Sequence, residues 1–180
     1  MSNEEMFFSV DVEASGPIPG EYSMLSLGCC LVENQKEMFY CELKPITEQY
    51  VPEALEIGGF DLQMLKSSGR EPSEAMEDFE NWVKHIAANR RAVCVGFNVS
   101  FDWQFINYYL HRYLGSNVFG IGALDIKAYY MGFAKTSWDA TRSSKIAEQY
   151  KPVDWAKNVH NALQDAIYQA EMFRRMRQAS

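Results

Sequence analysis

Short apolar runs separated by turn residues dominate the first 45 positions of the chain. The segment 6–12 is almost wholly apolar and has the length of a buried strand. Two further runs of strand character follow at 24–33 and 36–45, and the polar residues between them, Asn34 and Gln35, predict a β-hairpin. The segment SGPIPGEYS, which follows the first run, contains two glycines and two prolines and is typical of a loop.

From Pro72 onward the apolar positions follow a helical period. Ala75, Met76, Phe79 and Val83 recur three or four residues apart, and Pro72 suits a first helical turn. The other regular elements that we expect beyond Pro72 are strands at 91–98 and 120–124, and helices at 100–114, 126–134 and 161–176, the second of them capped by Asp125.

Two segments, 46–70 and 134–159, show no regular period, apart from short helices expected near Pro52 and Ile146. The order of elements is then β-β-β-α-β-α-β-α-α, which predicts an α/β layered fold with a mixed sheet. The 180 residues contain 47% hydrophobic residues and no linker rich in Gly, Pro or Ser. We therefore expect one domain spanning residues 1–180.

Charge and cysteine content argue against some classes of protein and favour others. A net charge of −7 argues against a protein that coats nucleic acid through a basic surface, although metal ions can neutralise one bound strand end. Cys29, Cys30, Cys41 and Cys94 form no C-x-x-C pair, so we interpret them as buried thiols; zinc ligation or disulfides are the alternative. The sequence shows neither a signal peptide nor a membrane span, and we expect a cytoplasmic protein.

Four acidic residues interrupt the apolar pattern. Asp11 and Glu13 stand at i and i+2 in the first strand, so their side chains share one face. Asp102 lies in the first turn after the fourth strand, and Asp165 lies within the apolar stripe of the last helix. Buried acids require partners, and a shared hard divalent cation is one. A solvated strand end and an ordinary acid at a helix N-terminus are the alternatives for Asp11–Glu13 and Asp102.

His160 stands five residues before Asp165. Five helical residues turn the chain through about 500°, so two side chains at this spacing do not share a helix face. We place His160 on the loop before the helix, where an imidazole can act as a general base; a neighbour of the helix cap is the alternative. His85 and His111 fit ordinary helix surfaces.

The segments DVE, NVSFD and HNALQD together resemble the three motifs of the DEDD exonuclease superfamily, in its His-containing branch. That branch includes oligoribonuclease, ribonuclease T and the proofreading exonuclease of bacterial replicative polymerase. The resemblance covers residues 7–173 and implies a ribonuclease H-like fold, with a mixed five-stranded sheet and helices on both faces. Two departures bear on substrate preference: Ala14–Ser15 replace a common Thr-Thr or Met-Thr pair, and Ser26 replaces a frequent Glu.

The resemblance also implies a mechanism. Asp11, Glu13, Asp102 and Asp165 would hold two Mg²⁺ or Mn²⁺ ions, and His160 would take the proton of the attacking water. The candidate substrate-binding residues are Ala14, Ser15, Gly16, Asn98, Phe101, Trp103 and Trp138. Phe101 and Trp103 fit the hydrophobic core equally well, whereas Trp138 lies in a polar loop that carries several basic residues.

The expected activity is 3′–5′ exonucleolytic hydrolysis of single-stranded nucleic acid, with release of nucleoside 5′-monophosphates. RNA is preferred over DNA because the chain is compact, acidic and without an extension that would tether a polymerase. The alternatives are a DNA repair or proofreading exonuclease and, from another class, an inactive nucleic-acid-binding module. The partners would be RNA or DNA 3′ ends and, as in many relatives, a second copy of the chain in a homodimer.

Overall fold

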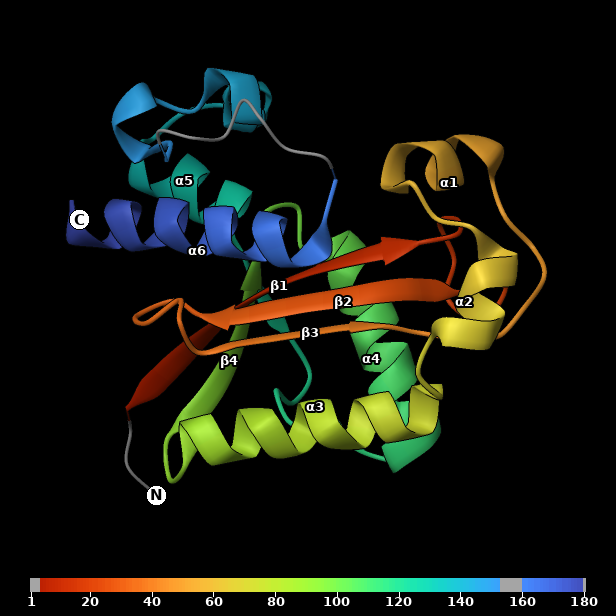
Figure 1. The fold of residues 1–180 in the computed structure, drawn as a ribbon. Helices are drawn as coiled ribbons and strands as arrows, with labels where there is room; N and C mark the ends of the chain where they lie inside the picture. The colour runs from red at the N-terminus through yellow and green to blue at the C-terminus, as the bar shows by residue number, and fades with distance from the viewer. Residues whose placement is uncertain (1–3, 153–159, 180) are drawn as a thin grey trace.

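A five-stranded sheet in the order β3-β2-β1-β4-β5 forms the centre of the protein (Figure 1). The computed structural model describes residues 4–152 and 160–179. The strands are β1 (Glu5–Ala14), β2 (Met24–Leu31), β3 (Met38–Glu42), β4 (Arg91–Gly96) and β5 (Ala123–Asp125). The pairs β1–β2 and β2–β3 are antiparallel, whereas β1–β4 and β4–β5 are parallel. The predicted hairpin and the mixed sheet are both confirmed.

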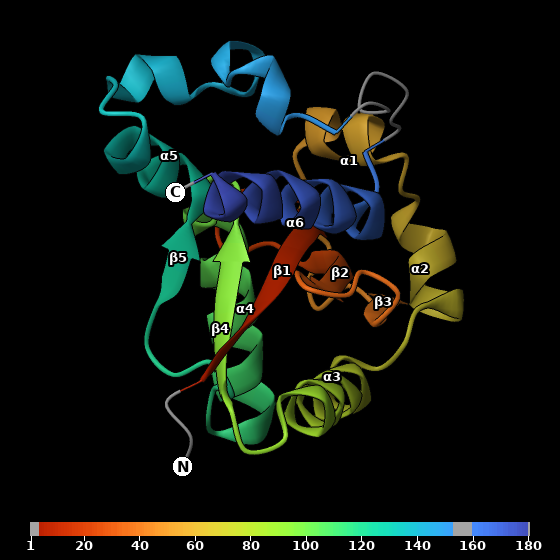
Figure 2. The ribbon, with the colours of Figure 1, turned by 90° about the vertical axis from the view of Figure 1, so that its left-hand side faces the viewer.

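Helices cover both faces of this sheet, as Figure 2 shows from the side. One face carries α3 (Pro72–Ala87) and α4 (Ser100–Leu114), and the other carries α5 (Ile126–Phe133) and α6 (Ala162–Gln178). The remaining elements are α1 (Pro52–Gly58), α2 (Leu62–Ser68) and the short 3₁₀ helices η1 (Trp138–Thr141), η2 (Ser143–Lys145) and η3 (Glu148–Tyr150). The ribonuclease H-like layering expected from the sequence is thus present.

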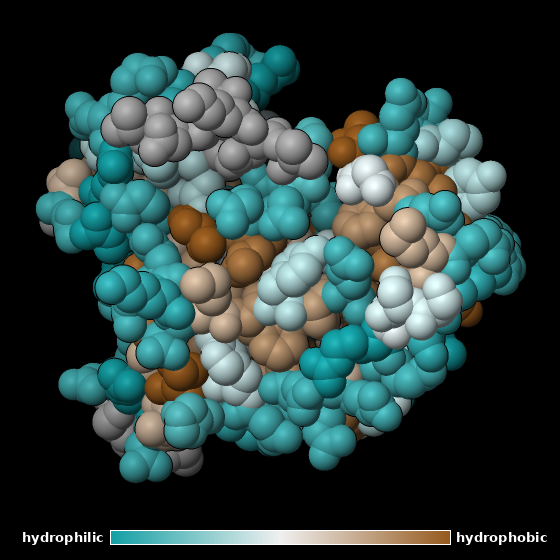
Figure 3. Space-filling view, in the orientation of Figure 1, coloured by the Kyte–Doolittle hydropathy of each residue, from teal (hydrophilic) through white to brown (hydrophobic). Residues whose placement is uncertain are grey.

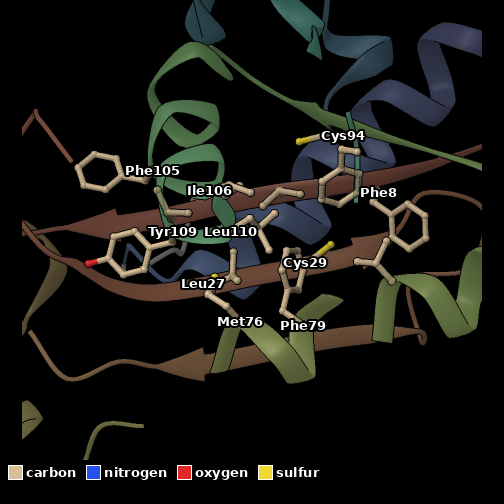
Figure 4. Close-up of a cluster of buried hydrophobic side chains, with 14 of the residues drawn as sticks. Phe8, Leu27, Cys29, Met76, Phe79, Cys94, Phe105, Ile106, Tyr109 and Leu110 are labelled. Carbon is tan, nitrogen blue, oxygen red and sulfur yellow. The ribbon is translucent and has the colours of Figure 1, made fainter. Parts of the chain in front are cut away.

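The alternation of side chains along β1 separates the core from the polar face. Phe8 and Val10 are fully buried in the cluster formed with α3 and α4, part of which is drawn in Figure 4. Phe7 points to the opposite face and lies edge-on against Phe173 of α6, with ring centres 5.5 Å apart. Because successive strand residues alternate, Asp11 lies on the α6 side of the sheet with Phe7.

Gly28 of β2 allows α6 to begin directly on the sheet. A Cβ atom at this position would lie 2.2 Å from the carbonyl carbon of Ala162 and 2.3 Å from the amide nitrogen of Leu163. Both contacts are with backbone, which cannot move aside as a side-chain rotamer does. The absence of a side chain at Gly28 therefore brings the first turn of α6, which carries Asp165, against the strands that carry the other acids.

The structure adds a helix, shortens a strand and defines the type of a predicted short helix. The segment predicted to contain only one short helix near Pro52 also contains α2, whose N-cap Asp61 accepts hydrogen bonds from two backbone amides. The expected strand 120–124 begins only at Ala123, after a turn at Gly120 with a φ of +85°. The short helix expected near Ile146 is present as two 3₁₀ helices, η2 and η3, which flank this residue.

The cysteines are packing residues. All four are free and buried, and burial raises the pKa of the Cys30 and Cys41 thiols to about 12. They are therefore protonated at neutral pH, and the alternative of disulfides is wrong. Among the described residues, no helix is both long and apolar enough to cross a membrane.

Candidate active site

A cleft of about 300 Å³ opens at the carboxyl ends of β1 and β4. Its lining residues are Asp11, Val12, Glu13, Phe97, Asn98, Phe101, Asp102, His160, Asp165 and Gln169. The structure thus brings together all four acids and the histidine singled out in the sequence. A larger hollow of about 1160 Å³ lies at the opposite end of β4, but its lining includes only one acid, Glu5, and no histidine. The smaller cleft is therefore the candidate active site.

The cleft forms where two parallel strands separate. Strands β1 and β4 pair from Glu5–Arg91 as far as Ser9–Val95, and Asp11 lies beyond the last pair. A β-bulge between Glu13 and Ala14 interrupts the pairing of β1 with β2 on its other side. The end of β1 is therefore partly released from both neighbours, which leaves space for side chains from α4 and α6.

Asp102 fills part of that space. It lies in the first turn of α4 and is buried, and its Oδ1 accepts a hydrogen bond of 2.9 Å from the backbone amide of Val12. Val12 stands between Asp11 and Glu13, so this bond fixes the α4 carboxylate beside the two acids of β1. One acid side chain thus replaces a strand-to-strand bond and joins the cluster.

Gln169 bridges the two separating strands. Its Nε2 donates to Asp11 Oδ1 at 2.7 Å, and its Oε1 accepts from the backbone amide of Phe97 at 2.8 Å. The side chain is only 5% exposed, so both polar ends of the amide have partners in a buried setting. This bridge fixes the orientation of the Asp11 carboxylate. Gln169 was not predicted, although an amide four residues after Asp165 lies near the same helix face and was a usable signal.

Burial raises the pKa values of the four carboxyl groups, with a smaller contribution from neighbouring acids for Asp11, Glu13 and Asp102. Burial, followed by the charges of Asp102, Asp165 and Glu13, raises the pKa of Asp11 well above its ordinary value. Burial and the charge of Asp165 raise the pKa of Glu13 to about 7, and burial raises that of Asp102 to about 8. Burial also raises the pKa of Asp165. Full ionisation of all four at neutral pH therefore requires a positive charge between them, as a divalent cation would supply.

His160 stands beside two of these carboxylates. Potential ligand atoms of Glu13, His160 and Asp165 all lie within 4.8 Å of one another, so one cation could contact all three. His160 is exposed and precedes the N-cap residue of α6, Asn161, on the loop where the sequence placed it. His85 and His111 are exposed on α3 and α4, as expected.

The other candidates from the sequence divide into two groups. Asn98 and Phe101 line the cleft. Trp103 is partly buried against the core, in agreement with its alternative interpretation, and it is not part of the cleft lining. Trp138 is 53% exposed on η1, outside the lining.

The segment after β1 stabilises its own loop. The Ser15 hydroxyl donates to the carbonyl of Gln49 and accepts from the amide of Ser23, both at 2.9 Å. Gly16 lies so close to the Tyr22 ring that a Cβ atom there would be 2.3 Å from it. Together with Ala14, these residues are outside the lining of the cleft, and a backbone contact with substrate stays a prediction for them.

Comparison with known proteins identifies the family. The sequence model of the exonuclease family (RNase_T) matches residues 8–173. The chain is 51% identical over 174 residues to the 3′-5′ DNA exonuclease Cap18 of Escherichia coli. The alignment covers 96% of this chain and 92% of Cap18. These matches extend over nearly the whole chain.

Solved structures share the fold at low identity. The nuclease domain of 3′hExo, a DEDDh family member bound to rAMP, superposes with a TM-score of 0.78 at 15% identity, over 97% of this chain and 92% of that one. The S. pombe protein Pop2p in its Mg²⁺- and Mn²⁺-bound form superposes with a TM-score of 0.68 at 15% identity, over 96% and 82%. This chain therefore belongs to the exonuclease family, within the DEDD superfamily of 3′–5′ exonucleases that its three motifs resemble.

Proposed function

We propose that the protein removes nucleotides one at a time from the 3′ end of single-stranded DNA and uses two Mg²⁺ or Mn²⁺ ions. The observation that carries this proposal is the convergence of four carboxylates with raised pKa values in one cleft. DNA is chosen because the relative with 51% identity is named a DNA exonuclease. RNA, which we expected from the sequence, is the alternative substrate, and hydrolysis of matched DNA and RNA decides between the two.

Asp11, Glu13, Asp102 and Asp165 would hold the ions, since carboxylate oxygens are the ligands that these hard cations prefer. When bound, such a metal pair supplies a nucleophilic water and offsets the charge that develops on the transferred phosphoryl group. Gln169 keeps the Asp11 carboxylate in one orientation through its two hydrogen bonds. The protein's part is thus to hold the acids rigidly despite their mutual repulsion.

His160 accepts the proton of the attacking water in this proposal. Its exposed position on the loop before α6 leaves it accessible to substrate and close to Glu13 and Asp165. Phe101 contacts the terminal nucleotide from the side of α4. The products are a nucleoside 5′-monophosphate and a strand that is shorter by one residue. A cytoplasmic location and a homodimer stay predictions.

The first experiment follows nucleotide release from 5′-labelled DNA and RNA of matched sequence, from about two to twenty nucleotides long, with Mg²⁺ or Mn²⁺. We expect a ladder that shortens from the 3′ end, faster on DNA, and no reaction in EDTA. Asp165→Asn should lower the rate by about 100-fold or more, because it removes one charge from the metal site. Asp78→Asn, the same change on the exposed surface of α3, is the control. Release of nucleotides in EDTA contradicts the metal-dependent mechanism.

The raised pKa of Glu13 predicts how metal-free stability depends on pH. Between its ordinary value of 4.5 and about 7, the folded protein holds a proton that the unfolded chain releases. Its contribution to stability is therefore present below pH 4.5 and is lost as the pH rises through 7. We expect calorimetry in EDTA to give a lower melting temperature at pH 8 than at pH 5, and Mg²⁺ to raise it more at pH 8.

The control for that prediction is Asp11→Asn, which removes one charge from the cluster and keeps the oxygen that accepts from Gln169. It should melt no lower than the wild type in EDTA at pH 8. Arg174 and Arg175 lower the pKa of Glu171 to about 2. Glu171 therefore stays ionised in the folded protein between pH 5 and 8 and does not obscure the effect of Glu13 on the melting temperature. A wild-type melting temperature that rises from pH 5 to pH 8 would contradict the raised pKa of Glu13.

The role of His160 is decided by separating rate from metal affinity. If it is a general base, His160→Ala should lower the rate by about 100- to 10,000-fold. Calorimetric titration should give nearly unchanged Mn²⁺ affinity, whereas Asp165→Asn should weaken it. His85→Ala, at an exposed position of α3, is the matched control. An equal loss of Mn²⁺ affinity in His160→Ala and Asp165→Asn makes His160 a ligand.

Gln169 supplies a test of rigid positioning. Gln169→Leu keeps most of the side-chain volume but removes both hydrogen bonds, and we expect Mn²⁺ affinity and rate to fall by about 10- to 100-fold. Gln164→Leu, on the exposed side of the same helix, is the control. Wild-type Mn²⁺ affinity in Gln169→Leu would show that the bridge between Asp11 and Phe97 does not orient a ligand.

A further inference from the structure

One edge of the cleft carries a lysine that the sequence analysis did not single out. Lys127 is the second residue of α5, and its Nζ lies 3.1 Å from the side-chain oxygen of Asn98. The same ammonium lies 4.3 Å from the ring centre of Trp138 and 6.0 Å from that of Phe97. Asn98 and Phe97 line the cleft, so Lys127 places a positive charge at its rim.

The hydrogen bonds around Lys127 leave its ammonium available to bind an anion. Asp125, the nearby acid at the end of β5, accepts from the backbone amide of Val99 at 2.8 Å and from that of Ala128 at 2.9 Å. Its carboxylate is therefore used to join the start of α4 to the start of α5. Within residues 4–152 and 160–179, Lys127 is in none of the ion pairs that the structure contains.

Trp138 holds the lysine near the cleft without being covered itself. A cation above an indole face is attracted by the ring, and this contact limits the conformations of a long, flexible side chain. The indole is 53% exposed, although large apolar side chains are usually buried. An exposed tryptophan beside a preformed cation is a suitable surface for a nucleobase next to a phosphate.

The surface on the other side of His160 carries acids instead of a lysine. A second pocket of about 280 Å³ lies there between β3 and the segment α1–α2, and its lining includes Glu42 and Asp61 but no lysine or arginine. Figure 3 shows apolar surface gathered over α1 and α2, where Ile57 and Met64 are more than half exposed. A phosphodiester chain is disfavoured beside two acids, so the strand backbone leaves the metal site toward α5 and η1.

We propose that Lys127, Asn98 and Trp138 form a subsite for the nucleotide on the 5′ side of the scissile bond. The ammonium of Lys127 binds the phosphodiester of that nucleotide, and the exposed face of Trp138 stacks on its base. Asn98 holds Lys127 in place from the edge of the cleft. This inference rests on the proposed function, because it takes the scissile phosphate to lie between the four carboxylates.

The test compares a substrate that has this nucleotide with one that lacks it. A single-stranded DNA of about eight residues fills the subsite, whereas the p-nitrophenyl ester of thymidine 5′-monophosphate has a nitrophenyl leaving group there. We expect Lys127→Gln and Trp138→Ala each to lower the ratio of kcat/KM for the DNA to kcat/KM for the ester by about tenfold. Lys127→Arg should restore most of the ratio, since it keeps the charge.

Salt dependence gives a second readout that a structural role would not change. Loss of one phosphate contact should reduce the slope of log affinity against log salt by about 0.7 for a single strand. The affinity is measured by fluorescence anisotropy of the labelled DNA in Ca²⁺. Lys36→Gln, the same substitution in the turn between β2 and β3, should leave both the ratio and the slope at wild-type values.

The inference is overturned if Lys127→Gln leaves both the ratio of kcat/KM values and the salt slope at wild-type values. It is also overturned if Lys127→Gln lowers kcat/KM equally for both substrates and leaves the salt slope unchanged. Failure of the proposed function looks different, because the wild type would then hydrolyse neither substrate with Mg²⁺ or Mn²⁺. In that case the anisotropy measurement still decides the inference. Equal affinity and equal slope in the wild type and Lys127→Gln overturn it, and a reduced slope supports it.

Discussion

The separation of β1 from β4 after the Ser9–Val95 pair is the constraint on which the active site depends. If the two strands stayed paired, their backbones would satisfy each other and leave no space between them. Because they diverge, two side chains complete the missing bonds, Asp102 to the amide of Val12 and Gln169 to the amide of Phe97. Both bonds are buried or partly buried, where an unsatisfied amide would be unfavourable. The site is thus assembled from groups that also hold the diverging ends of two inner strands together.

The same bonds hold like charges close together. Carboxylates that were free to move would separate or become protonated, and Glu13, with its pKa raised to about 7, is close to that limit. Asp102 is fixed by the backbone of β1, Asp11 by Gln169, and Asp165 by the start of α6, which Gly28 admits against the sheet. Repulsion held in a fixed geometry favours the binding of a cation, so rigidity and metal affinity have one origin.

The sequence predicted the acids because each stands where local pattern fixes its position. Strand alternation puts Asp11 and Glu13 on one face, and helix starts place Asp102 and Asp165. Gln169 lies near the helix face of Asp165, but its role depends on a partner 158 residues away, and that of Lys127 on a partner 29 residues away. Local periodicity does not reveal either contact. The helix α2 was missed for a different, local reason: its seven residues give too few turns for an apolar period. The functional residues that we did not predict are therefore those whose roles depend on long-range contacts.

The distribution of charge around the cleft accounts for an acidic nuclease. The chain carries a net charge of −7, so long-range attraction does not bring a polyanion to it. In the proposed function, binding therefore relies on a few contacts at the cleft: cations between the carboxylates, stacking on exposed rings, and one lysine at the rim. Few phosphate contacts mean that affinity changes little with salt. The proposed site therefore favours binding of a strand end over binding of the interior of a long strand.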